Sequence, residues 1–109
     1  MPDTSPVDPF APEDCQTMAD VRAGIDALDA ELVRMLAQRF AYMRAAARIK
    51  PERTQVRDEP RKAVVIANAT QLAGELGLPA ALIGELWERL VEGSIAYELG
   101  AWDDRRKPR

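Results

Sequence analysis

The longest uninterrupted helical signal in this sequence runs from Thr17 to Lys50, and it constrains the fold more than any other feature. The stretch contains no proline and a single glycine, Gly24. Thr17 and Asp20 have the spacing of a capping box, which marks the start of a helix. A helix of about 33 residues is roughly 50 Å long, whereas a compact 100-residue monomer has a radius of gyration of about 13 Å. We therefore expect the long helices of two chains to pack together in a dimer.

Aspartate, glycine and proline mark two further helices. Asp58 is a favourable N-cap, and Gly77 is expected to end that helix in the left-handed conformation. Pro79 is expected to begin the third helix. No strand pattern and no internal repeat is present, so the expected fold is an all-α, three-helix chain with one long N-terminal helix. The expected boundaries are 59–76 and 79–102 for the shorter helices, 1–16 for a disordered N-terminal arm, 17–103 for the domain and 104–109 for a basic tail.

The residue types exclude several kinds of chemistry. The sequence contains no histidine and one cysteine, Cys15. There can be no Ser-His or Cys-His nucleophile pair and no histidine metal site, so an enzyme of this composition works through arginine, lysine, carboxylates and hydroxyls. A lone cysteine, no secretory signal and no apolar run long enough for a bilayer predict a cytoplasmic protein without a membrane partner.

The charge distribution favours a small anionic ligand. A net charge of −3 argues against nucleic-acid binding. Between residues 34 and 62, however, the sequence contains nine basic residues and only three acidic ones. An acidic protein with a basic centre is typical of anion binding, although some of these bases must lie on solvated helix faces.

Charged residues lie on faces that are otherwise apolar. On the third helix, Ser94 and Glu98 interrupt an apolar stripe, and a glutamate there needs a proton or a partner. On the long helix, cations share one heptad seam with five apolar residues. Salt bridges, with Asp29 as one candidate, would satisfy these cations, and so would a bound anion. The seam is Arg22, Ile25, Asp29, Leu32, Leu36, Arg39, Met43, Ala46 and Lys50.

Distances along the long helix suggest a site shared between two chains. Arg39 and Lys50 are 11 residues apart, about 16 Å along the axis, so their long side chains can converge on one ligand. Arg22 lies about 25 Å from Arg39. If all three bind one ligand, Arg22 must come from the other subunit.

The ordered set of these residues resembles the type II, or AroQ-class, chorismate mutases. The opening helix is similar over residues 21–39, with Lys50 at the expected distance, and Val56-Arg57-Asp58 with Arg61 resembles the family's loop into the second helix. Val91-Glu92-Gly93-Ser94 with Glu98 resembles its third-helix site. The resemblance implies an intertwined homodimer that rearranges chorismate, a small dianion, to prephenate without cofactor or metal.

The resemblance also implies a role for each site residue. Arg22 of the partner and Arg39 would hold the carboxylates of chorismate, and Lys50 and protonated Glu98 would donate hydrogen bonds to its ether oxygen. Asp58, Arg61 and Ser94 would complete its orientation, with Arg61 acting partly through its backbone or by supporting Asp58.

Two positions depart from the bacterial members of the family. Glu98 stands where glutamine is common, although fungal members have glutamate, and Lys62 stands where a glutamate often contacts the substrate hydroxyl. The related isochorismate pyruvate-lyases share the arginines and the lysine but usually lack a match to Ser94 and Asp58. A lyase of this kind, or a non-catalytic helical dimer with salt-bridged seams, therefore remains an alternative to the mutase.

Overall fold

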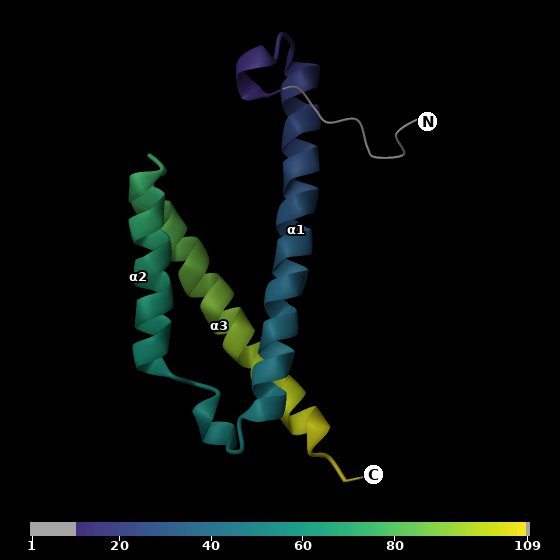
Figure 1. The fold of residues 1–109 in the computed structure, drawn as a ribbon, viewed down its shortest axis with the longest axis vertical. Helices are drawn as coiled ribbons and strands as arrows, with labels where there is room; N and C mark the ends of the chain where they lie inside the picture. The colour runs from purple at the N-terminus through teal and green to yellow at the C-terminus, as the bar shows by residue number, and fades with distance from the viewer. Residues whose placement is uncertain (1–10, 109) are drawn as a thin grey trace. The chain divides into compact units, whose positions relative to one another are not determined.

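The computed structural model describes residues 11–108, which form three α-helices and two short 3₁₀ turns (Figure 1). None of these described residues forms a strand, so the predicted all-α, three-helix fold is confirmed. Contacts divide the chain into two compact units, one ending at Arg39 and the other beginning at Phe40. In chain order the elements are η1 (Pro12–Asp14), α1 (Met18–Ile49), η2 (Arg53–Gln55), α2 (Glu59–Glu75) and α3 (Ala80–Arg105).

The long helix α1 begins where the capping box predicted. The hydroxyl of Thr17 accepts a hydrogen bond from the backbone N–H of Asp20 at 3.1 Å, and the Asp20 carboxylate accepts from the backbone N–H of Thr17 at 3.3 Å. These reciprocal bonds satisfy backbone donors that have no partner inside the helix. The predicted start of α1 is therefore confirmed.

The limits of α2 also follow the predicted signals. Asp58 is the N-cap, and Gly77 has a φ angle of +73°, in the left-handed region that favours glycine. The N–H of Gly77 donates to the carbonyl of Gly74, and the N–H of Leu78 donates to that of Ala73. These two bonds occupy carbonyls at the end of α2 and turn the chain into α3.

Two segments are more ordered than the sequence predicted. The expected disordered arm covered residues 1–16, but η1 (Pro12–Asp14) forms a 3₁₀ turn within it, with proline at its start. Residues 1–10 of that arm lie outside the described residues. At the other end, α3 continues to Arg105 rather than ending near Trp102. Arg106 follows and donates hydrogen bonds to three backbone carbonyls, which accounts for the longer helix.

The core of the second unit lies where α2 and α3 pack against each other (Figure 1). Its buried centre consists of Val56, Val91 and Ile95. Five partly buried side chains surround that centre: Val65, Ile66, Trp87, Leu99 and Trp102. The burial of Val91 and Ile95 on α3 fixes which face of that helix points inward, and Ser94 and Glu98 share this face.

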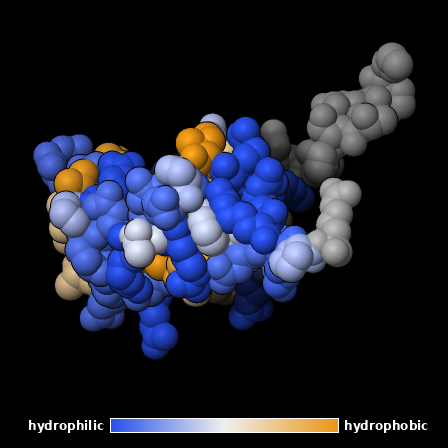
Figure 2. All heavy atoms as spheres, turned by 90° about the horizontal axis from the view of Figure 1, so that it is seen from below, coloured by the Kyte–Doolittle hydropathy of each residue, from blue (hydrophilic) through white to orange (hydrophobic). Residues whose placement is uncertain are grey.

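The single chain leaves many apolar side chains of α1 in contact with solvent. Leu28 is 63% exposed, and Leu32, which lies four residues later on the same face of the helix, is 50% exposed. Figure 2 shows one face of the molecule that is mostly hydrophilic, with isolated hydrophobic residues. Among residues 11–108, no helix is both long enough and apolar enough to cross a bilayer. An amphipathic helix whose apolar residues remain exposed is typical of a surface that another polypeptide covers.

Candidate active site

Lys50 and Glu98 form the most buried ion pair of the described residues. The ammonium Nζ of Lys50 donates to Oε2 of Glu98 at 2.7 Å. The side chain of Glu98 is only 5% exposed and that of Lys50 is 30% exposed. Removing a carboxylate from water is costly unless a cation and hydrogen bonds replace the water. Lys50 and Glu98, which the sequence placed on the apolar faces of two different helices, thus form an ion pair.

Ser94 lies one helical turn before Glu98 on the buried face of α3. Its side chain is buried, and its hydroxyl donates to the carbonyl of Leu90 at 2.6 Å. The inward orientation predicted for Ser94 and Glu98 is confirmed.

Asp58 and Arg61 meet at the start of α2. Oδ1 of Asp58 accepts a hydrogen bond from the backbone N–H of Arg61 at 3.0 Å, while both side chains are exposed. The backbone of Arg61 thus holds the Asp58 carboxylate at the start of α2.

A pocket of about 670 Å³ brings Lys50 and Asp58 together. The segment between α1 and α2 forms most of its wall, and the start of α2 closes it. Two cations, Lys50 and Arg57, and two carboxylates, Asp58 and Glu59, line the pocket, while Glu98 binds the Lys50 ammonium from outside this lining. The complete lining is Ile49, Lys50, Pro51, Gln55, Arg57, Asp58, Glu59 and Pro60.

The two remaining predicted residues, Arg22 and Arg39, belong to the other unit of the chain. Arg22 is exposed, whereas Arg39 is half-buried. Burial lowers the pKa of the Arg39 guanidinium, which still remains charged at any physiological pH. The other five of the seven predicted site residues belong to the second unit: Lys50, Asp58, Arg61, Ser94 and Glu98.

A second charged cluster, which the sequence did not predict, joins α2 to α3. Arg57 makes two hydrogen bonds to the carboxylate of Glu92, at 2.9 and 3.0 Å. Nζ of Lys62 donates to Glu88 at 2.7 Å and to Glu92 at 2.9 Å. Glu88 and Glu92 are four residues apart on α3, a spacing that could have indicated a carboxylate pair facing a basic helix. Lys62 stands where the family often has a substrate-binding glutamate, and here its ammonium group binds two glutamates of α3.

The Arg57–Glu92–Lys62 cluster is expected to make stability depend on acid pH. The hydrogen bond from Arg57, and then that from Lys62, lowers the pKa of Glu92 from 4.5 to about 2. Ionised Glu92 therefore stabilises the fold above pH 4.5, and this contribution is lost as the pH falls toward 2. The variant Glu92→Gln should have a lower melting temperature at neutral pH and a flatter melting temperature across the acid range.

Circular dichroism melts of wild type and Glu92→Gln over that range would measure this dependence. Glu31→Gln is a matched control because Glu31 makes only a solvent-exposed pair with Arg34 on α1. Parallel melting curves for wild type and Glu92→Gln throughout the acid range would contradict the assignment.

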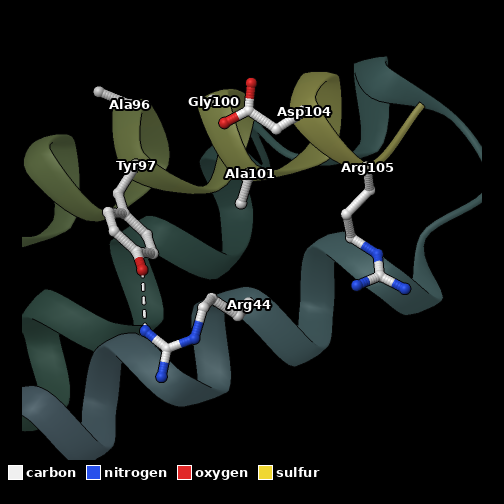
Figure 3. Close-up of a pocket in the computed structure, with 7 residues that line it drawn as sticks. All are labelled: Arg44, Ala96, Tyr97, Gly100, Ala101, Asp104 and Arg105. Atoms are coloured by element: carbon white, nitrogen blue, oxygen red, sulfur yellow. Dashed lines mark hydrogen bonds between the residues drawn. The ribbon is translucent and has the colours of Figure 1, made fainter. Parts of the chain in front are cut away.

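A second pocket, of about 490 Å³, lies in the same unit between the C-terminal part of α1 and α3 (Figure 3). Arg44 donates to the hydroxyl of Tyr97 at 2.8 Å, and the Tyr97 ring packs edge-on against Phe40. Small residues, Ala96, Gly100 and Ala101, form much of its lining. None of the predicted site residues lines this pocket, so it is separate from the one that contains Lys50.

Comparison with known proteins assigns the chain to one class of enzyme. Residues 21–99 match the family described as chorismate mutase type II. The chain is also similar to an isochorismate pyruvate lyase of Pseudomonas aeruginosa, with 32% identity over 95 residues that cover 87% of this chain and 94% of that protein. These matches define an enzyme of the AroQ class. The chain belongs to the type II chorismate mutase family, as the resemblance indicated.

Proposed function

We propose that this protein is a chorismate mutase, which rearranges chorismate to prephenate without a cofactor or metal. The observation that carries this proposal is the buried pair of Lys50 and Glu98, with Ser94 one turn away on the same face of α3. A lysine and a carboxyl group that share one buried position can donate to a single ligand oxygen from two sides. Asp58, in the same pocket as Lys50, supplies a further acceptor for orientation.

The rearrangement suits a site without a nucleophile. The bond from C5 of the ring to the ether oxygen breaks while a new carbon–carbon bond forms, in one step and with no proton transfer. The protein must hold the compact conformer of the substrate and stabilise negative charge at the ether oxygen. Lys50 and protonated Glu98 would donate to that oxygen. The guanidinium groups of Arg39 and of Arg22 of the partner subunit would bind the two carboxylates.

A homodimer is part of this proposal. The exposed apolar residues of α1 need a covering surface, and a second copy of the same helix supplies one of matching length and character. In such a dimer Arg22 would cross to the site of the other chain, as the spacing along the long helix requires.

The similarity to the isochorismate pyruvate lyase supports a second candidate function, the formation of salicylate and pyruvate from isochorismate. Ser94 and Asp58 favour the mutase because the lyases of this family usually lack a match to both. A non-catalytic dimer is the third candidate, since the Lys50–Glu98 bond would also satisfy two seam charges without any ligand.

One experiment separates the three candidates. The purified protein is incubated with chorismate and with isochorismate in turn, and prephenate, salicylate and pyruvate are measured against protein-free controls. We expect prephenate from chorismate at a rate well above the uncatalysed one. Salicylate with equimolar pyruvate from isochorismate, in the absence of prephenate, would instead identify a lyase. No product above the controls would identify the non-catalytic dimer.

The donor role of Glu98 is tested by its amide variant. Glu98→Gln has nearly the same shape as the wild-type side chain and always offers an N–H donor to the ether oxygen, so the variant should retain activity with chorismate. Steady-state rates of wild type and variant measure this, and a folded but inactive Glu98→Gln variant would refute the donor role.

A further inference from the structure

The C-terminal end of α3 is bonded to the end of α1, directly at Lys50. A helix leaves its last four carbonyl groups without donors of its own. Here the guanidinium of Arg106 donates to the carbonyl of Ala47 at 3.1 Å and to that of Lys50 at 2.9 Å. The indole Nε1 of Trp102 donates to the same Lys50 carbonyl at 3.0 Å. A cation at the C-terminal end of a helix is also favoured by the helix dipole.

Residues along one face of the C-terminal part of the chain bind both the side chain and the backbone carbonyl of Lys50. Glu98, Trp102 and Arg106 follow at intervals of four residues, which places them on the same face. Glu98 binds the ammonium group, whereas Trp102 and Arg106 bind the backbone carbonyl. The Arg106 guanidinium also lies 3.9 Å from the centre of the Trp102 ring, so the two donors stabilise each other through a cation–π contact.

The segment that follows Lys50 is attached to the same end of α3. Nε and Nη2 of Arg53 donate to the two carboxylate oxygens of Asp103 at 2.9 and 3.2 Å. This paired geometry fixes orientation as well as distance, and the bond from Arg53 lowers the pKa of Asp103. The backbone on both sides of Lys50 is thus tied to residues 102–106.

We propose that Trp102 and Arg106 are positioning residues, which fix the backbone of Lys50 so that its ammonium group stays at the reacting oxygen. This inference rests on the proposed function, because it assumes that Lys50 touches the substrate. A displacement of about 1 Å in a catalytic group can cost up to about 100-fold in rate. The bonds to one carbonyl from a rigid indole and a guanidinium fork prevent such a displacement.

Two variants remove these bonds. Trp102→Phe keeps an aromatic ring in the core but loses the Nε1 donor, and Arg106→Ala removes the guanidinium. We expect kcat to fall about fivefold in Trp102→Phe and about tenfold or more in Arg106→Ala. KM should stay within about twofold, since Lys50 acts on the transition state. Arg106→Lys retains a charged donor and should recover part of kcat.

Matched controls separate positioning from packing and charge. Trp87→Phe removes the same ring volume from the same core cluster without touching the Lys50 carbonyl, and Arg105→Ala removes a neighbouring cation. Both should keep wild-type kcat. Melting temperatures of all variants identify any that fail to fold, and Trp102→Phe tests the inference if Arg106→Ala is unfolded.

Chemical labelling of Lys50 tests the inference without relying on turnover. Limited acetylation followed by mass spectrometry should show faster modification of Lys50 in both variants, with Lys62 unchanged as an internal reference. Unchanged Lys50 labelling in folded variants would overturn the inference, even if kcat fell. If wild type converts neither substrate, the proposed function fails, whereas the labelling result still decides whether Trp102 and Arg106 hold Lys50.

Discussion

Replacement of Lys50 by alanine is expected to lower kcat/KM for chorismate at least about 100-fold, a loss of about 2.7 kcal/mol of transition-state stabilisation. The ammonium group is one of two donors to the oxygen where charge develops, and water in a partly buried pocket is a poor substitute. Arg39→Ala should cause a loss of the same order because Arg39 would hold a carboxylate of the substrate. Steady-state kinetics of both variants measure these losses.

The structure shows why Lys50→Ala needs a companion variant. Removing Lys50 leaves the buried carboxylate of Glu98 without its ion-pair partner, which can destabilise the fold by itself. In the double variant Lys50→Ala/Glu98→Gln, no buried charge remains. We expect the double variant to regain most of the lost melting temperature and none of the lost activity. Recovery of both together would mean that Lys50 acts only on stability.

Arg34→Ala is the matched control for Arg39→Ala. Arg34 lies off the heptad seam of α1, is exposed and pairs with Glu31 at 2.7 Å. Exposed pairs of this kind contribute little, so activity should stay within a few-fold of wild type. Equal losses at Arg34 and Arg39 would show that the substrate contacts a different face of α1.

Local signals predicted most of the fold. The Thr17–Asp20 capping box, the Asp58 N-cap and the left-handed Gly77 each depend on residues within four positions in the chain, where spacing alone determines geometry. The inward direction of Ser94 and Glu98 followed from the apolar period of α3 in the same way. Two expectations differ from the structure: η1 forms a turn within the arm that was predicted to be disordered, and α3 ends at Arg105 rather than near Trp102.

Contacts between distant residues could not be predicted in the same way. Lys50 and Glu98 were each recognised as unusual on an apolar face, yet nothing in their separation of 48 residues indicated that they bind each other. The bonds of Arg57 to Glu92 and of Arg106 to Lys50 bridge 35 and 56 residues. Such pairs depend on how helices pack and on which rotamers reach across, and a single sequence does not specify either. The sequence therefore predicted only a basic tail over residues 104–109 and gave no sign that Arg106 bonds to the end of α1.

Activity is expected to reappear when two inactive variants, Arg22→Ala and Lys50→Ala, are mixed as homodimers and allowed to exchange subunits. In the proposed dimer each site takes Arg22 from one chain and Lys50 from the other. Each homodimer therefore has two defective sites, but a mixed dimer has one site with both defects and one with neither. After full exchange of equal amounts, half of the dimers are mixed, so about a quarter of all sites should be intact.

The expected recovery is large because it starts from a background at least about 100-fold below wild type. Exchange is followed independently by native mass spectrometry of an isotope-labelled partner, so that slow exchange is not mistaken for failure. A mixture of Arg39→Ala with Lys50→Ala is the matched control. Both of those residues would come from the same chain, so every mixed dimer would keep one defect in each site and activity should stay low. Recovery in the control mixture, or none in the Arg22 mixture despite proven exchange, would contradict a site that Arg22 completes from the partner subunit.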